Sequence, residues 1–166
     1  MTSSAPRPSS RGGTAVAVYQ RARLVYQYNK LAAIRAGVYP EWGGNVEFEI
    51  FSFFEICYHL KDWIIEDPDP HPRSDVEAYV RDSPALRICA DICNRLKHRR
   101  LRRQRSKSPL GLFKLTSITT IGPDPKAATV SIPKATITTE RGEECCYALA
   151  TECLGEWHRY FGEFVP

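Results

Sequence analysis

Residues 45–66, "NVEFEIFSFFEICYHLKDWIIE", decide the fold, because one helical face of this stretch is almost entirely apolar. Apolar side chains recur there at steps of three and four, which predicts an amphipathic helix with one buried side. Asn45 suits the N-cap position, and the acidic residues of the first turn suit the positive end of the helix dipole. We expect this helix at the centre of the molecule, with a core stripe of Ile50, Phe53, Phe54, Cys57, Leu60 and Ile64.

Four further helices are expected around the central one, each with a single apolar face. They fall in residues 14–37, in a short stretch that Ser74 and Glu77 begin with a capping box, in the stretch opened by Ser83 and Pro84, and in residues 142–164. The expected core face of the helix in residues 14–37 is Val18, Leu24, Val25, Tyr28, Leu31 and Ala32. That of the helix after Ser83 is Leu86, Cys89, Ala90, Cys93 and Leu96. That of the helix in residues 142–164 is Cys146, Leu149, Ala150, Cys153, Trp157, Tyr160 and Phe161.

The periodicity changes between about residues 110 and 140, where Thr, Ile and Val surround the turn-like segment "GPDPK". This pattern predicts a β-hairpin or a small three-stranded ribbon, with Pro133 at an edge or a break. The expected fold is therefore mainly α-helical, a helical bundle with a β-hairpin or small β-ribbon inserted before the C-terminal helix. Residues 1–13 are expected to form a disordered leader, and residues 14–166 one domain.

Length and composition predict a protein with its own hydrophobic core and without a membrane span. The chain has 166 residues, 43% of them hydrophobic, and charged side chains interrupt its longest apolar stretch, so no membrane span is expected. The N-terminal segment lacks the apolar run of a secretion signal. We therefore expect a cytoplasmic location and six reduced cysteines.

Charge is distributed unevenly along the chain. The formal net charge is +4, but residues 95–107 hold eight Lys or Arg and no acid, whereas residues 41–82 hold eleven acids and three bases. This pattern permits a basic patch that binds phosphate groups, and it equally permits the two regions to face each other in a dimer.

The basic run holds more positive charge than the end of a helix needs. Lys97, Arg99 and Arg100 would complement the helix dipole, which explains the first charges structurally. The later charges exceed this need and predict salt-dependent binding to a polyanion such as RNA, with a solvated loop as the alternative. They are Arg102, Arg103, Arg105 and Lys107, and together with Lys97, Arg99 and Arg100 they form the predicted nucleic-acid-binding run.

Two polar stripes supply the candidate catalytic residues. The central helix carries His59 and Asp62 together with Ser52, Glu55 and Glu66, and the helix after Ser83 carries Arg87, Asp91, Asn94 and His98. If the stripes share one cleft, a histidine beside a carboxylate provides a general base and an arginine stabilises phosphate charge, as metal-independent RNA cleavage requires. Alternatively, both stripes are the solvated sides of amphipathic helices.

The cysteines predict neither a metal site nor a catalytic thiol. CxxC spacing is absent, and the residues nearest to a metal-binding pattern are Cys57, Cys89, Cys93, His59 and His98. Cys57 lies two residues from His59, which directs their side chains to different sides of a helix, and Cys93 lies on the expected core stripe, opposite the histidine face. The chain also lacks a glycine-rich phosphate loop and a G-x-S-x-G motif, so no cofactor and no serine nucleophile are expected.

The segments "CYHLKDWI" (57–64) and "LRICADICNRLKH" (86–98), with the later "ALATECLGEWHRYF" (148–161), resemble a group of small uncharacterised bacterial helical proteins with Y-H-L-[KR]-D-W and N-x-x-K-H motifs. More distantly, the layout is similar to HEPN domains, helical bundles of toxin–antitoxin and phage-defence systems. Many HEPN domains are dimeric, metal-independent ribonucleases with an R-x4-6-H motif. The resemblance matches His98 to the family histidine and Asn94 to its polar position, whereas the arginine position falls on Asp91, Ile92 or Cys93.

Two hypotheses follow from these patterns. The first is a HEPN-like protein that binds RNA or cleaves it without metal, with His98 as base or acid and Arg87 or Lys97 beside the phosphate. The second is a non-enzymatic interaction module, in which the same helices form a homodimer or bind a partner protein. In that module His59, Asp62, Asn94 and His98 form a buried hydrogen-bond network that fixes helix register.

Overall fold

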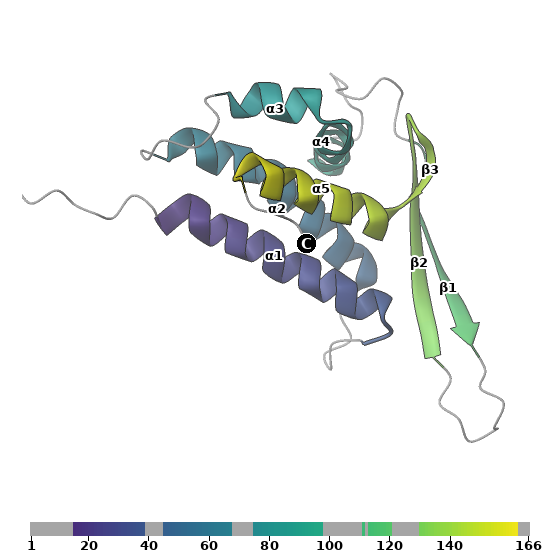
Figure 1. Ribbon diagram of the computed structural model, residues 1–166. Helices are drawn as coiled ribbons and strands as arrows, with labels where there is room; N and C mark the ends of the chain where they lie inside the picture. The colour runs from purple at the N-terminus through teal and green to yellow at the C-terminus, as the bar shows by residue number, and fades with distance from the viewer. Residues whose placement is uncertain are drawn as a thin grey trace, which may run out of the picture.

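The computed structural model describes residues 15–38, 45–67, 75–97, 111, 113–120 and 130–162, which form five helices and a three-stranded antiparallel sheet (Figure 1). The helices are α1 (Ala15–Arg35), α2 (Val46–Glu66), α3 (Val76–Asp82), α4 (Pro84–Lys97) and α5 (Cys146–Tyr160). The strands, all between α4 and α5, are β1 (Phe113–Thr120), β2 (Val130–Thr139) and β3 (Gly142–Cys145). The mainly helical fold with a β insertion before the C-terminal helix is confirmed over these residues.

Several predicted features lie outside the described residues. They are the leader 1–13, most of the proline-rich loop 66–73, the turn at 122–126, and His98 with the later part of the basic run, including Arg99, Arg100, Arg102, Arg103, Arg105 and Lys107. Lys97 is described as the last residue of α4, but its side chain is not. Predictions about these residues stay predictions.

Helix α2 lies in the core as its sequence pattern predicts. Asn45 caps it, because Oδ1 of Asn45 accepts the backbone N–H groups of Glu47 at 2.9 Å and Phe48 at 3.4 Å. All six residues of the predicted core stripe are buried. The helix contacts each of the other four, so most of the core forms around it.

Helix α1 buries only part of the face predicted for it: Leu24 and Leu31 are buried, and Val25 and Tyr28 pack against the core. Val18 is 51% exposed and Ala32 is also exposed, whereas two glutamines, Gln20 and Gln27, are buried. The complete buried face is Ala17, Gln20, Leu24, Gln27, Leu31 and Ile34, which alternates steps of three and four. The prediction used apolar residues only and therefore missed the glutamines. Gln27 is accommodated because its Nε2 donates to Oε2 of Glu49 on α2 at 2.6 Å and to the backbone carbonyl of Glu49 at 3.0 Å.

Helices α3 and α4 follow each other across a single capping residue. Asp75, not the predicted Ser74, caps α3, since its Oδ1 accepts the Ala78 N–H at 2.8 Å. Ser83 precedes α4 as predicted, and its Oγ accepts the Leu86 N–H at 3.4 Å. The expected core stripe of α4 is buried except for Leu96, which is 39% exposed.

The sheet has the strand order β1-β2-β3 and lies at one end of the helical bundle, where β2 contacts α1 and α5 (Figure 1). Pro133 pairs in register with Ser117 of β1, whereas β3 pairs only with the Thr136–Thr139 part of β2. Pro133 therefore lies where β2 is flanked by β1 alone, which agrees with the expected edge position. Ala135 and Ile137 extend the core onto the sheet.

Candidate functional site

His59 links α2 to α4 near the last turns of α4. Its Nδ1 lies 2.8 Å from Oδ2 of Asp62, and its Nε2 lies 3.7 Å from Sγ of Cys93. Because a carboxylate only accepts, Nδ1 carries the proton, and Nε2 can accept the Cys93 thiol proton. The His59 side chain is 35% exposed. An oriented imidazole thus lies at the solvent side of the α2–α4 contact.

Asp62 is held in its ionised form by its neighbours. It accepts from His59 and also from Nζ of Lys61 at 2.5 Å, and Lys61 donates in addition to Oε1 of Glu77 on α3 at 2.7 Å. Burial raises the pKa of Asp62, but the hydrogen bonds from Lys61 and His59 outweigh it and bring this pKa below its ordinary value. The carboxylate can therefore stabilise a positive charge that forms on the imidazole.

Cys93 and Asn94 place the second half of α4 beside this pair. Cys93 was expected to lie opposite the histidine face of its own helix, but a histidine of the neighbouring helix reaches it. The Cys93 side chain is fully buried, so its proximity to His59 does not make it an accessible nucleophile. Asn94 is half-buried and follows Cys93 along the helix. His98, the other predicted catalytic histidine, lies outside the described residues.

Arg87 is engaged on the sheet side of α4. Its Nη2 lies 3.1 Å from Oε1 of Glu140, and its Nη1 donates to the backbone carbonyl of Arg81 at 3.1 Å. Only 18% of the Arg87 side chain and 8% of the Glu140 side chain are exposed. The guanidinium therefore ties the start of α4 to the turn between β2 and β3. The structure pairs it with Glu140, whereas the His59–Asp62 pair meets α4 near its other end.

Asp91 is completely buried, although the second polar stripe was considered as a solvated helix face. It lies on the same helix as Arg87 and Asn94, whose side chains are both partly exposed. The polar stripe of α4 is therefore not one continuous wet surface. Its members enter different environments, from the core at Asp91 to the half-buried position of Asn94.

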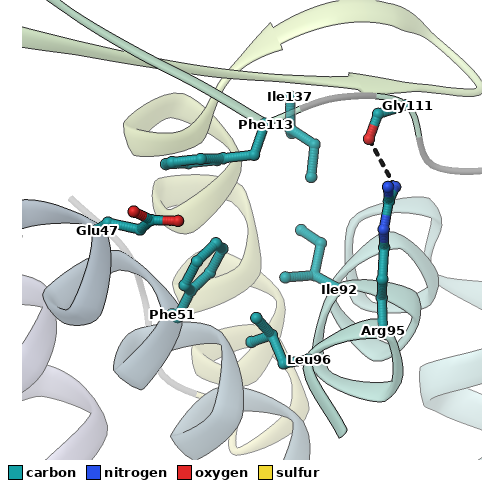
Figure 2. A pocket seen from close by; sticks show the side chains of 8 residues that line it. All are labelled: Glu47, Phe51, Ile92, Arg95, Leu96, Gly111, Phe113 and Ile137. Atoms are coloured by element: carbon teal, nitrogen blue, oxygen red, sulfur yellow. Dashed lines mark hydrogen bonds between the residues drawn. The ribbon is translucent and has the colours of Figure 1, made fainter. Parts of the chain in front are cut away.

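A pocket of about 320 Å³ opens between the first turns of α2, the last turns of α4 and the sheet (Figure 2). The rings of Phe51 and Phe113 lie in it with centroids 4.9 Å apart, and the Glu47 carboxylate points into the space between them and α4. Arg95 forms the opposite wall, where its Nη1 donates to the Gly111 carbonyl at 2.6 Å. The remaining lining residues are Ile92, Leu96 and Ile137.

Sequence analysis did not identify this pocket. Glu47 was interpreted only as a helix-dipole residue, and Phe113 only as part of a strand. Phe113, at the start of β1, meets Phe51 of α2 only in the folded chain, and periodicity along one segment carries no information about such a contact. Gly111 gives a partial signal, because a Cβ there would lie 2.4 Å from Cβ of Thr138, so the close approach to β2 requires glycine.

The cysteines include a group that sequence analysis only partly anticipated. The sulfur atoms of Cys57, Cys89 and Cys153 lie within 4.8 Å of one another, and all three side chains are buried. Cys153 was absent from the residues considered for a metal site, because nothing in the spacing connects α5 with α2 and α4. Among the described residues, this is the one cluster of potential metal ligands with three members.

None of the helices over the described ranges is both long and apolar enough to cross a membrane. Comparisons with known protein families, curated proteins and solved structures found no match to this chain. The chemistry of the site is therefore inferred from its own residues.

Proposed function

We propose that this chain is a HEPN-like RNA-binding protein whose pocket between α2, α4 and the sheet accepts a base of single-stranded RNA. The observation that carries the proposal is the composition of the pocket, which combines two phenylalanine rings, a carboxylate and a guanidinium around about 320 Å³. Aromatic rings stack on the face of any base, and such stacking contributes about 1–3 kcal/mol per base. The pocket thus offers a surface for a base that the basic run itself lacks.

The polar groups of the pocket suit the edge and the backbone of a nucleotide. The Glu47 carboxylate can accept hydrogen bonds from an exocyclic amino group, which uracil does not have. Arg95 lines the pocket, and a guanidinium binds phosphate oxygens well. We therefore expect adenine, cytosine or guanine to be preferred over uracil in the pocket.

The described residues on both sides of residues 98–110 lie at this pocket. Arg95 and Leu96 come before that segment and Gly111 follows it, and all three line the pocket. Most charges of the basic run fall within the segment. The charges of the run would attract the RNA backbone through counterion release, largely without regard to sequence. Electrostatic attraction from the run and stacking in the pocket then act on the same strand.

His59 and Asp62 supply the catalytic part of the proposal. In metal-independent cleavage, a base removes the proton of the 2′-hydroxyl, whose oxygen attacks the adjacent phosphorus, and an acid protonates the departing 5′-oxygen. His59, oriented by Asp62, takes one of these roles, and His98 takes the other. Arg87 has no role in this step, because its guanidinium is paired with Glu140.

Binding is tested by fluorescence anisotropy with labelled single-stranded RNA at low and moderate salt. Phe51→Ala should weaken binding by about 1–3 kcal/mol with an unchanged salt slope. Phe48→Ala is the matched control, because Phe48 is an exposed phenylalanine of the same helix outside the pocket lining. Neutralising Arg102, Arg103 and Arg105 together should reduce the salt slope by about 3. Absence of binding at low salt, or equal affinity of wild type and Phe51→Ala, refutes the pocket as the RNA site.

Cleavage is tested separately, with RNA incubated in EDTA and analysed on denaturing gels. Wild-type protein should cleave, whereas His59→Ala and His98→Ala should not, with thermal midpoints near that of the wild type. An inactive wild type removes the catalytic part of the proposal and leaves RNA binding in place. If the wild type is inactive and His98→Ala has a lower thermal midpoint than the wild type, the polar residues form a structural network.

That network is the basis of the second candidate function, a partner-binding or dimerisation module. It is favoured by one specific observation, the position of His59 between Asp62 on its own helix and Cys93 on α4. Analytical ultracentrifugation of the full chain, with and without RNA, distinguishes the two functions. A dimer that forms alone and does not bind RNA supports the module.

A further inference from the structure

Three cysteines from three different helices meet in the core. Cys57 comes from α2, Cys89 from α4 and Cys153 from α5, and the solvent-exposed fraction of each is zero. Their sulfur atoms all lie within 4.8 Å of one another. With metal–sulfur bonds of about 2.3 Å, the sulfurs lie roughly 4 Å apart in a planar three-coordinate thiolate site and about 3.5 Å apart in a pyramidal one. Small side-chain rotations therefore suffice to bring the three sulfurs around one ion.

Trp157 supports the cluster from α5. Its indole N–H donates to the Cys57 carbonyl at 3.1 Å and lies 3.3 Å from the Cys57 sulfur. Such an N–H donor to a ligating sulfur is the kind of outer-shell contact that tunes metal–thiolate sites.

The ion is selected by charge and by ligand number. Over the described ranges, no fourth His, Cys, Asp or Glu joins the three thiols. Zinc in structural sites takes four ligands, and with three thiolates it would leave one negative charge in the core, while copper(I) would leave two. A trivalent ion with three thiolates is neutral, and the lone pair of arsenic(III) takes the place of a fourth ligand.

We propose that Cys57, Cys89 and Cys153 form a buried three-coordinate site for a thiophilic trivalent ion of the arsenic(III) type. The reaction with arsenous acid forms three As–S bonds and breaks three As–O bonds, and each thiol proton leaves with a hydroxyl group as water. No electrons are transferred, so no oxidant or reductant is required. Binding would crosslink α2, α4 and α5, and it is independent of the proposed RNA site.

The test uses the reduced full-length chain titrated with sodium arsenite, monitored by native mass spectrometry and by the thermal midpoint. We expect one arsenic per chain, a mass consistent with three lost protons, and a midpoint that rises with arsenite concentration. Cys57→Ala, Cys89→Ala and Cys153→Ala should each weaken binding by roughly tenfold or more, as loss of a metal contact does. Cys146→Ala is the matched control, because Cys146 is equally buried on α5 but lies outside the cluster.

A second measurement applies even if the alanine variants do not fold. Wild-type chain, with and without arsenite, is unfolded briefly in the presence of a maleimide, and the labelled cysteines are identified by mass spectrometry. Arsenite should protect Cys57, Cys89 and Cys153 and leave Cys145 and Cys146 reactive. Equal labelling with and without arsenite, wild-type affinity in Cys153→Ala, or tighter binding of zinc than of arsenite by these thiols overturns the proposal.

Discussion

Replacement of Glu140 by glutamine should destabilise the fold by about 2 kcal/mol while leaving RNA affinity unchanged. The substitution keeps the size of the side chain and its ability to accept a hydrogen bond, but removes the charge that faces Arg87. Because the guanidinium ties the start of α4 to the β2–β3 turn, the loss acts on folding. The candidate RNA site lies near the other end of α4.

The magnitude follows from the environment of the ion pair. Breaking a fully buried pair costs about 3–5 kcal/mol, whereas exposed pairs contribute about 0–1 kcal/mol. Arg87 and Glu140 are closer to the buried limit, with 18% and 8% of their side chains exposed. The second hydrogen bond of Arg87, to the Arg81 carbonyl, persists in the variant and lowers the cost. The remaining loss is comparable to one charged hydrogen bond, about 1.5–3 kcal/mol.

The assay is urea unfolding of wild type, Glu140→Gln, Arg87→Met and the double variant, together with RNA anisotropy for each. Methionine keeps much of the apolar stem of the arginine. The double-mutant cycle should give a coupling energy of about 1–2 kcal/mol between the two positions. The Nε atom of Arg87, which is buried without a hydrogen-bond partner within the part of the chain that the structure describes, adds a penalty that the methionine variant relieves.

Two results would contradict the structural role of Arg87. The first is a coupling energy near zero, which would mean that the ion pair does not contribute to folding. The second is an Arg87→Met variant of normal stability that no longer binds or cleaves RNA. That outcome would return Arg87 to the catalytic set in which the sequence analysis placed it.

Three further predictions concern single side chains. Burial raises the pKa of Glu49, but the hydrogen bonds that it accepts outweigh burial and lower this pKa below its ordinary value of 4.5. Glu49 therefore stabilises the fold at pH values above 4.5, and this contribution is lost as the pH falls through the lower pKa of the folded state. Glu49→Gln should flatten the acid limb of a plot of urea midpoint against pH. Burial lowers the pKa of Lys61, but its carboxylate partners outweigh burial and raise this pKa above its ordinary value of 10.5. The contribution of Lys61 to folding stability is therefore complete below pH 10.5 and is lost as the pH rises through the pKa of the folded state. Lys61→Met should remove this dependence of the thermal midpoint on alkaline pH. Gly111→Ala should destabilise by about 1–3 kcal/mol in urea because the new Cβ meets Thr138, whereas Gly155→Ala, which has open space in α5, should stabilise by about 0.5–1 kcal/mol.

Local sequence signals predicted the elements that depend on local chemistry. The N-caps Asn45 and Ser83 are confirmed, because capping requires only a short polar side chain beside the first free N–H groups. The core stripe of α2 is confirmed because its apolar periodicity is nearly complete. The stripe of α1 is confirmed at Leu24 and Leu31 but was wrong at Val18. It also missed Gln27, which is buried through a hydrogen bond to Glu49 on another helix.

The candidate site was predictable only as a set of residues, not as an arrangement. His59 and Asp62 were predicted to share one helical face, and their side chains lie 2.8 Å apart because they are neighbours on one helix. The partner of Arg87 is 53 residues away, and the pocket walls come from α2, α4 and the sheet. Such contacts depend on how elements pack, and no periodicity within one element specifies them.

The burial of α4 has a consequence for how this protein can diversify. After the exposed Pro84, the side chains from Ala85 to Cys93 are buried, apart from the partly exposed Arg87, whereas Arg95 and Leu96 are exposed. Substitutions in the first turns are therefore constrained by folding, whereas the last turn, which forms one wall of the pocket, can accept new side chains at little cost in stability. The lining of the pocket can therefore change by substitution in the last turn of α4 while the first turns keep their sequence.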